Sequence, residues 1–578
     1  MGRHSAGLRK REAGASGQQP RPVADRAGRL TAAWAAGVFL VLLGAYLANG
    51  DFLPGNDAKA NVYLPVSLLR EGNLSFTSRE APFMFVWEAR LPPASGGAPE
   101  DEAFLQRWRR FAETAWSNRV DGWQQRLIGV SAERLYAWQM MGNPGPMYYI
   151  IKSIRNTPDD QPLYVNTFGP GAGLCALPMV AAAELFTDLP ADAWTLWYGA
   201  KLAAAMLVAG SAVLVFLSAR LFTTSPRSAV LALGYGLGTC VWSISSQAMW
   251  QHGPNEFFLA MGSYFLLRSR RETGRMLWPA LCGAALAAAV ACRPTSVLAA
   301  LAVGAYLLVV SRRAMAVYVL AALPIAAALA GYNTYYLGAP WRFGQAAAGQ
   351  TVALQKTGSP KLWSTPLWEG AAGLMLSPSR GLLVFSPIVL LSVAGGVRMW
   401  RRSYAPLIPL LAGMLALWVI AFKWFDWWGG WCFGYRPLVD TMPLLAVLAV
   451  PALDWLFARR WALAVAAVLL AWSVMVQVLG AWAFDMTGWN LRVVHIEMYL
   501  KGQDAPMIIS DPDLMEQIIK TREVVRAVPL VRDIDQPKNR HRLWSIKDSQ
   551  ILYSLQRFAA ARKQKKEDIR MWLEHPSS

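Results

Sequence analysis

The stretch "TAAWAAGVFLVLLGAYLA" (31–48) carries no charged residue over about 18 positions. A helix of about that length matches the apolar thickness of a bilayer. The stretch is long for the core of a signal peptide, and many similar runs follow it along the chain. We therefore interpret it as an uncleaved first transmembrane helix.

The composition supports a membrane protein with many spans. Of the 578 residues, 54% are hydrophobic and only 16% are charged, whereas soluble domains carry about 25% charged residues. Apolar runs recur from about residue 31 to residue 484. The 27 Trp residues fit this interpretation, because Trp favours the membrane–water interface. The fold class that we predict is an all-α polytopic membrane protein.

The net charge of +19 does not indicate nucleic acid as a partner. Much of the Arg lies in short loops between apolar runs, where basic residues set the orientation of a membrane protein. The cysteines are scattered and form no CxxC pair, so neither a zinc site nor a disulfide framework is predicted. The five are Cys175, Cys240, Cys282, Cys292 and Cys432.

The positive-inside rule predicts eleven spans within a range of 11–13, with the N-terminus in the cytoplasm. Residues 1–30 are expected to be a disordered basic tail, and residues 50–191 to form a long first outer loop. Residues 485–578 are polar and are expected on the outer side, as a small domain or a tail. The predicted spans are about 31–48, 193–219, 228–247, 254–268, 276–292, 295–311, 314–335, 383–398, 405–422, 437–457 and 461–484.

Two segments of the first outer loop carry a helical pattern. The run "FGPGAGLCALPMVAAAELF" (168–186) is apolar enough to span, but a twelfth span would reverse the side of every later basic loop. We interpret it as a juxtamembrane or re-entrant helix. Residues 100–130 have an amphipathic pattern. This second helix either lies on the membrane surface or packs on the outer face of the protein itself.

With this topology, unusual polar residues gather on the outer face. Polar and charged groups at membrane depth are costly and so suggest function. Asp57 and Asn61 follow the first span, His252 lies in "MWQHGPNE" (249–256), and Arg293 lies in "ACRPTS" (291–296). Arg380 lies in "LMLSPSRGLLVFSP" (374–387). The aromatic stretch "FKWFDWWGGWCFGYRPLVD" (422–440) carries Lys423, Asp426, Trp428 and Arg436.

The residue types favour chemistry on a lipid phosphate. Arg presents planar donors that match phosphate oxygens, and an aspartate can act as a general base on a hydroxyl. Neither a P-loop nor a dinucleotide-binding motif occurs, and "DID" (533–535) lacks the context of a nucleotide-sugar motif. Structural roles stay open: Asp57 as a helix N-cap, His252 as a turn residue, and Arg293 as a residue that snorkels to the interface. Arg380 and Arg436 could instead contact lipid head groups.

Four stretches carry a resemblance to a known family. "NDAKANVYLPVSLLREGNL" (56–74), "WQHGP" (250–254), "SPSRGLLVFSP" (377–387) and "WWGGWCFGYRPLVDTMP" (427–443) resemble stretches of bacterial GT-C glycosyltransferases. This superfamily of integral-membrane enzymes includes protein mannosyltransferases and lipid A aminoarabinose transferases. The resemblance covers the layout of residues 31–484 and implies an inverting transfer from a polyprenyl-phosphate-sugar on the outer face.

The resemblance also implies roles for individual residues. Asp57 is the expected base, with Asp51 as the weaker candidate. Many members carry a second acid after the first, whereas Ala58 follows Asp57 here. We therefore predict no metal ligands, with Mg²⁺ or Mn²⁺ left as an unsupported alternative. The expected donor-phosphate contacts are Arg380, Arg436, Arg293 and Lys423. The expected further substrate contacts are Asn61, His252, Asp426 and Trp428.

The predicted partners are a polyprenyl-phosphate-sugar donor, a glycan, lipid or protein acceptor of the cell envelope, and membrane lipids. The expected location is a bacterial plasma membrane with the active site on the periplasmic or extracytoplasmic side. Three alternatives remain: a flippase for lipid-linked glycans, a ligase or polymerase of such glycans, and a non-catalytic scaffold. A flippase would be expected to show inverted repeats or paired broken helices, and no internal repeat is evident.

Overall fold

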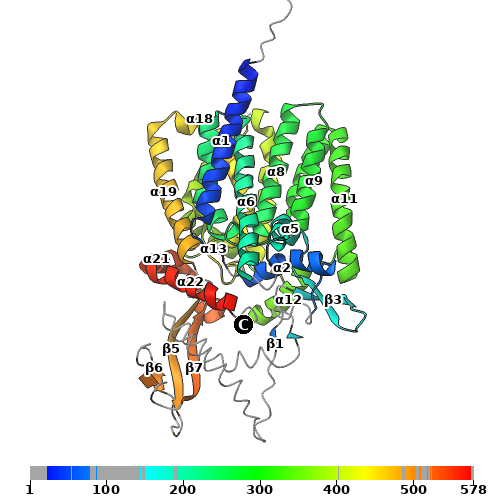
Figure 1. The fold of residues 1–578 in the computed structure, drawn as a ribbon. Coiled ribbons are helices and arrows are strands. Elements are labelled where there is room, and N and C mark those ends of the chain that lie inside the picture. The colour runs from blue at the N-terminus through cyan, green and yellow to red at the C-terminus, as the bar shows by residue number, and fades with distance from the viewer. Residues whose placement is uncertain are drawn as a thin grey trace, which may run out of the picture.

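The structure, a computed structural model, is a bundle of long helices with short helices and strands gathered at one end (Figure 1). It describes residues 22–53, 55–77, 150–187, 193–400, 402–484, 488–500 and 524–574, with short pieces at 86–87 and 144–145 and between 502 and 521. Among these residues, six helices are long and apolar enough to cross a membrane, by length and composition. Four shorter apolar helices accompany them. The prediction of a helical polytopic membrane protein is confirmed, and the count of eleven spans stays a prediction.

The bundle is built from helices that are often interrupted by 3₁₀ or π turns. Helix α1 begins at Pro22, within the range expected to be a disordered tail. The elements of the bundle are α1 (Pro22–Leu47), α6 (Ala193–Arg220), α7 (Ser225–Gly238), η2 (Val241–Ser245), α8 (His252–Arg271), α9 (Leu277–Cys292), η3 (Pro294–Ser296), α10 (Val297–Val310), α11 (Arg312–Leu337), α14 (Leu382–Phe385), η4 (Pro387–Val389), α15 (Leu390–Arg398), η5 (Arg402–Leu407), α16 (Ile408–Lys423), η6 (Arg436–Thr441), α17 (Met442–Leu448), η7 (Val450–Ala452), α18 (Leu453–Phe457) and α19 (Arg460–Ala483).

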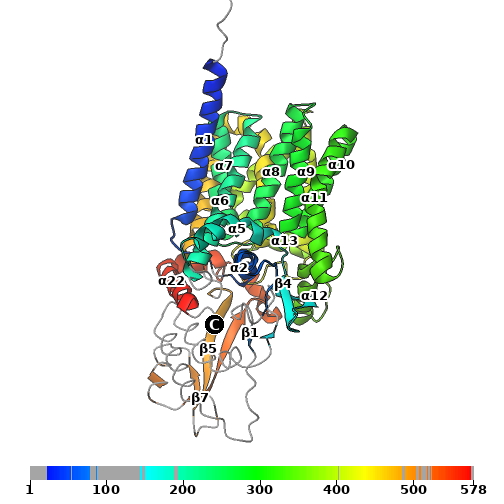
Figure 2. The same ribbon diagram turned by 45° about the vertical axis from the view of Figure 1, so that its right-hand side comes forward.

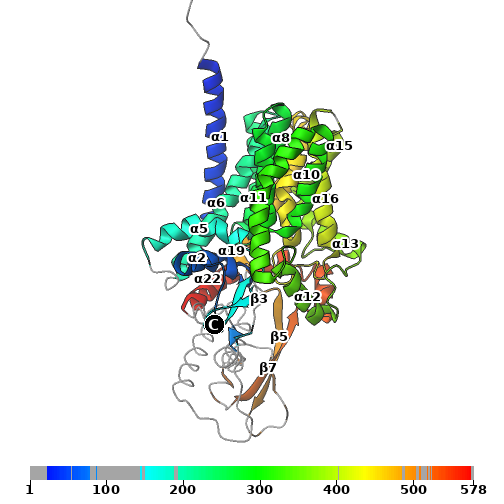
Figure 3. The ribbon, with the colours of Figure 1, turned by 90° about the vertical axis from the view of Figure 1, so that its right-hand side faces the viewer.

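Short elements cover one end of this bundle. They are α2 (Asn56–Glu71), the antiparallel pair β3 (Ile150–Asn156) and β4 (Pro162–Asn166), α5 (Gly171–Glu184), α12 (Gly344–Thr357) and α13 (Leu367–Leu376). Strands β1 (Val86–Trp87) and β2 (Pro144–Gly145) form a second antiparallel pair. Helix α5, which falls in the ambiguous run 168–186, lies across the end of the bundle rather than along it (Figures 2 and 3). The amphipathic pattern at 100–130 lies outside the described residues.

The C-terminal segment folds at the same end (Figure 1). A three-stranded antiparallel sheet has the order β6–β5–β7. Its strands are β5 (Leu491–Leu500), β6 (Met507–Ile509) and β7 (Val524–Asp533). They are followed by η8 (Pro537–Trp544), α21 (Gln550–Gln556) and α22 (Phe558–Glu574). Helix α22 is fixed to the bundle because the ammonium of Lys565 donates to the carbonyl of Ala481 at 2.9 Å.

Basic residues gather at the opposite end of the bundle. Helix α8 ends at Arg271, α11 begins at Arg312, α15 ends at Arg398 and α19 begins at Arg460. The N-terminus of α1 lies at this end too, as Figure 1 shows. Arg227 joins α7 to α18 there through an ion pair with Asp454 of 2.7 Å. The helix directions therefore place the basic loops at one end and the short elements at the other.

Close packing within the bundle relies on small residues. An added Cβ at Gly283 in α9 would lie 2.0 Å from the carbonyl oxygen of Tyr318 in α11. Small residues let helix backbones approach closely, which stabilises helix pairs in membranes through dispersion. Gly283 thus sets the separation of α9 and α11, and Arg293 follows directly after α9.

We predict that Gly283→Ala lowers the stability of the bundle. The new methyl group would force α9 and α11 apart, at a cost of about 1–3 kcal/mol. Thermal unfolding of the detergent-solubilised protein measures this change. Gly331→Ala is the matched control, because an added Cβ in that part of α11 meets nothing within 4 Å. Equal unfolding temperatures for the two variants would contradict the packing role.

Candidate active site

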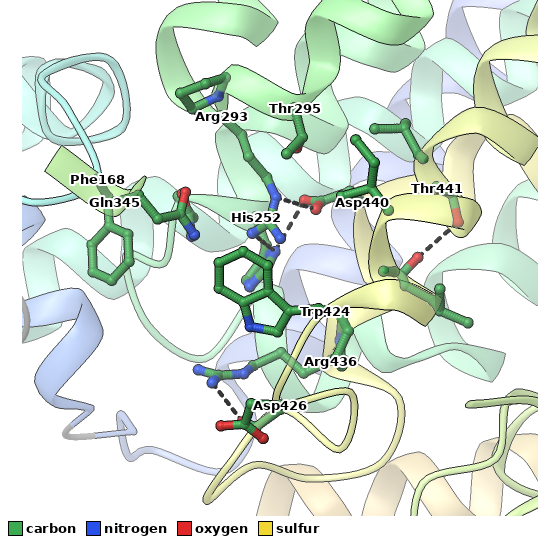
Figure 4. Close-up of a pocket in the computed structure, with 18 of the residues that line it drawn as sticks. Phe168, His252, Arg293, Thr295, Gln345, Trp424, Asp426, Arg436, Asp440 and Thr441 are labelled. Atoms are coloured by element: carbon green, nitrogen blue, oxygen red, sulfur yellow. Dashed lines mark hydrogen bonds and ion pairs between the residues drawn. The ribbon is translucent and has the colours of Figure 1, made fainter. Parts of the chain in front are cut away.

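A cavity of about 330 Å³ lies at the end of the bundle that carries the short elements. Its lining comes from segments far apart in the sequence, and Figure 4 shows several of these residues pointing into one space. Ligand sites are typically concave, mainly apolar and equipped with a few polar groups. The polar and aromatic residues that line the cavity include Asp57, Trp250, Gln251, His252, Arg293, Thr295, Gln345, Trp418, Trp424, Asp426, Arg436, Asp440 and Thr441.

Asp57 reaches the cavity from the first turn of α2. The N-cap of this helix is Gly55, so Asp57 is not the capping residue. Its carboxylate forms an ion pair of 2.8 Å with Nη1 of Arg436, across 379 positions in the sequence. The Asp57 side chain keeps 25% of its surface exposed. An acid therefore stands at the cavity, accessible and held by one arginine.

Arg436 is held on three sides. Besides Asp57, its Nη2 donates to the carbonyl of Gly429 at 2.7 Å. Its guanidinium also lies over the Trp250 ring, 5.2 Å from the ring centre. A guanidinium on an aromatic face gains cation–π attraction. These contacts fix the direction of Arg436 along the cavity wall.

A second ionic group lies deeper in the same cavity (Figure 4). The Asp440 carboxylate contacts Nε of Arg293 at 2.7 Å and Nδ1 of His252 at 3.0 Å. Nη1 of Arg293 also lies 3.2 Å from Nδ1 of His252. Because all three side chains are at most 15% exposed, the charges of Asp440 and Arg293 need each other as partners. The group joins α8, the α9–α10 junction and η6.

Sequence reasoning missed Asp440. It is the last residue of the aromatic stretch 422–440 and lies in η6, two residues before helix α17. An acid at the start of an apolar run is costly without a partner, and this signal could have identified it. Its neighbours His252 and Arg293, both candidate site residues from the sequence, line the cavity.

Arg380 is placed outside the cavity and is fully buried. Nε donates to the carbonyl of Trp428 at 2.8 Å. Nη1 donates to the Ser379 carbonyl and to the Gln550 side chain. Nη2 donates to the Gly430 carbonyl and to the Asn490 side chain. A guanidinium has five N–H donors, so all are engaged. The geometry disfavours the phosphate-binding role that we expected. Arg380 instead holds the aromatic stretch 422–440, which we call the aromatic loop.

Three other predicted site residues also lie outside the cavity lining. Asn61 is buried and bridges α2 to the Met249 carbonyl and to Asn166. Lys423 contacts the carbonyl of Thr365 at 3.5 Å. Trp428 is buried and donates its indole N–H to Asp535 at 2.9 Å. These contacts position the loops around the cavity.

Asp426 lines the cavity as part of an ionic cluster with Lys356. The Lys356 ammonium lies 2.6 Å from Asp426 and 2.9 Å from Asp535. Burial lowers the pKa of Lys356, but the two carboxylates outweigh burial, so its pKa lies above the usual value. Burial, together with the charge of Asp426, raises the pKa of Asp535. The cluster therefore joins α12, the aromatic loop and the C-terminal segment through one shared cation.

The acids of "DID" (533–535) have structural partners. Asp535 accepts from the Trp428 indole, and Asp533 accepts from the Trp431 indole at 2.9 Å. Both acids thus dock the C-terminal segment onto the aromatic loop. Among the described residues, no group of three or more His, Cys, Asp or Glu side chains could hold a metal ion.

No protein-family model matches the chain, and no curated protein matches it. Among solved structures, the chain is similar to ArnT from Cupriavidus metallidurans, crystallised bound to undecaprenyl phosphate. The sequence identity is 12% and the TM-score is 0.42. The match covers 95% of this chain and 77% of that chain.

We predict that Arg380→Met lowers the unfolding temperature markedly. The change leaves several buried acceptors without partners, which costs about 3 kcal/mol or more in total. Arg342→Met is the matched control, because within the described part of the chain the exposed Arg342 side chain makes one hydrogen bond, of 3.3 Å, to the Leu337 carbonyl. Thermal unfolding of both variants checks the prediction. An unchanged unfolding temperature combined with weaker binding of a lipid phosphate would instead return Arg380 to a phosphate-binding role.

Proposed function

We propose that the protein is a membrane glycosyltransferase that moves a sugar from a polyprenyl-phosphate donor to a hydroxyl acceptor, with inversion at the anomeric carbon. The observation that carries the proposal is the convergence of one accessible carboxylate and two guanidinium groups on a single cavity. Asp57, Arg436 and Arg293 line that cavity at the end of an apolar bundle. The motif resemblance to GT-C enzymes supplies the donor class.

Arg293 is suited to bind the donor phosphate. Its Nε and Nη1 face Asp440 and His252. Among the described residues, no hydrogen bond or ion pair engages Nη2, so its two N–H groups can reach a ligand in the cavity. Asp440 and His252 fix the guanidinium plane, and preorganised donors stabilise developing charge without reorganisation. As the glycosidic bond breaks, Arg293 and Arg436 stabilise the departing lipid phosphate.

Asp57 is the proposed general base. It takes the proton of the acceptor hydroxyl while the oxygen attacks the anomeric carbon. The bond between that carbon and the phosphate oxygen breaks on the opposite face, and its electron pair leaves with the lipid phosphate. One displacement of this kind inverts the anomeric configuration, as in inverting enzymes that use a single base.

The apolar part of the cavity suits a sugar and a lipid tail. Trp250, Trp418 and Trp424 line it, with Leu362, Leu417 and Ile420 beside them. Aromatic rings bury large apolar area and present flat faces, on which a sugar ring can stack. In this proposal, residues 31–484 form the catalytic module, and residues 485–578 hold its aromatic loop in place.

The proposed side of the reaction is extracytoplasmic. The basic helix ends lie opposite the cavity, and basic loops favour the cytoplasm. The cavity then faces the outer compartment of a bacterial plasma membrane, with the N-terminus in the cytoplasm. The acceptor is a hydroxyl of a cell-envelope glycan, lipid or protein.

We predict that Asp57→Asn lowers sugar transfer about a hundredfold or more, because the amide cannot accept the acceptor proton. The assay uses purified protein in lipid, radiolabelled polyprenyl-phosphate sugars and a membrane extract as the source of acceptors. Asp51→Asn is the comparison, because Asp51 is buried and does not line the cavity. We expect it to retain transfer.

The other outcomes of this assay would assign a different catalytic base or a different function. A reversed ranking, with Asp51→Asn inactive and Asp57→Asn active, would make Asp51 the base. A product that carries a whole glycan would indicate a ligase or polymerase. Lipid translocation without any covalent product would identify a flippase and overturn the transferase proposal.

We predict that Asp440→Asn raises the KM for the lipid donor about tenfold, with a smaller change in kcat. The loss of a charged partner costs about 1.5–3 kcal/mol and loosens the hold on Arg293. Steady-state kinetics with varied donor concentration measures both constants. Asp454→Asn is the control, because Asp454 pairs with Arg227 at the opposite end of the bundle. A lower kcat at unchanged KM would contradict a donor-positioning role.

A further inference from the structure

Two of the five cysteines meet in the folded protein, although they are far apart in the sequence. Cys175 lies in α5, and Cys292 is the last residue of α9. Their thiols influence each other electrostatically, so the two side chains lie near one another. Neither takes part in the proposed transfer.

The backbones of the two helices impose this contact. An added Cβ at Gly171, in the first turn of α5, would lie 2.4 Å from the Ala291 carbonyl oxygen and 2.7 Å from the Cys292 nitrogen. Residues four apart share one face of a helix, so Cys175 lies on the same face as Gly171. The close approach at Gly171 therefore brings the face of α5 that carries Cys175 toward the end of α9.

The two thiols differ in access. Cys292 is buried, with 1% of its surface exposed, whereas Cys175 is partly exposed. The contact with Cys292 lowers the pKa of Cys175, and burial opposes this effect only in part. A lowered thiol pKa raises the thiolate fraction, and the thiolate is the reactive form. Cys240, Cys282 and Cys432 are buried.

We propose that Cys175 and Cys292 form a reversible disulfide site that joins α5 to α9 beside the active-site cavity. The oxidant is a disulfide of the extracytoplasmic compartment, so the natural setting rests on the proposed side of the reaction. The Cys175 thiolate attacks that disulfide, and one thiolate leaves. Cys292 then loses its proton and attacks the Cys175 sulfur, which releases the second thiol. Two protein thiols become one disulfide, and the oxidant becomes two thiols.

The disulfide would fix one wall of the cavity. Phe168 precedes α5 and Arg293 follows Cys292 directly, and both line the cavity. A covalent link between α5 and α9 therefore restrains the separation of these two residues. It also closes a long loop of the chain, which constrains the unfolded state.

The experiment counts free thiols in purified full-length protein in lipid. The protein is treated with oxidised glutathione, denatured in SDS and labelled with a maleimide polymer that shifts the protein on a gel. We expect three labels after oxidation and five after reduction, since the chain has five cysteines. The unfolding temperature of the oxidised protein should exceed that of the reduced protein.

Two variants make the count specific. Cys175→Ser should show four labels before and after oxidation and no redox effect on the unfolding temperature. Cys282→Ser is the matched control, because Cys282 is buried and donates its thiol hydrogen to the Gly262 carbonyl at 3.3 Å, ten positions before Cys292 in α9. The Cys282→Ser variant has four cysteines and should lose two of its four labels on oxidation. Five labels in oxidised native protein would overturn the proposal.

Labelling in intact cells separates this proposal from the proposed function. A disulfide in cells supports both the site and its extracytoplasmic side. A pair that oxidises in purified protein but is reduced in cells supports the disulfide site and contradicts the proposed side. The transfer assay on Asp57→Asn is independent of either result.

Discussion

An unpaired charge in an apolar bundle is the most costly feature this protein could carry, and the structure avoids it at the cavity end. The bilayer interior offers no hydrogen bonds, so each buried polar group must find a partner within the protein. Arg380 uses all five donors on the protein itself. Asp440 is shared between Arg293 and His252. At the cavity, Asp57 and Arg436 stay partly accessible, and this is why the cavity is the candidate site.

Much of this arrangement can be predicted from the sequence, because it follows from local features. Long apolar runs predict helices. Whether a basic cluster precedes or follows a run predicts the direction of that helix across the membrane. Once the directions are assigned, the loops that carry Asp57, His252, Arg293 and Arg436 must meet at one end. These four residues line one cavity in the structure. Their convergence required only topology, which hydropathy and charge describe well.

Which charged residues face the cavity and which have structural roles could not be predicted in the same way. Arg380 and Arg436 look equivalent in sequence, since each lies in a polar stretch before an apolar run. Their difference depends on distant partners: Gln550 and Asn490 of the C-terminal segment reach Arg380, whereas Asp57 reaches Arg436. The same segment brings Asp535 to Lys356. Such pairings arise from tertiary packing, which no local pattern encodes.

The ion pair between Asp57 and Arg436 gives the proposed reaction an order of events. While the pair is closed, the base is engaged by the cation that the donor phosphate would also use. A phosphate carries oxygens that match a guanidinium well, so donor binding competes for Arg436 and loosens its hold on Asp57. Arg436 stays directed along the wall through Gly429 and Trp250. In the proposed mechanism, the base therefore becomes available to the acceptor hydroxyl once the lipid donor is in place.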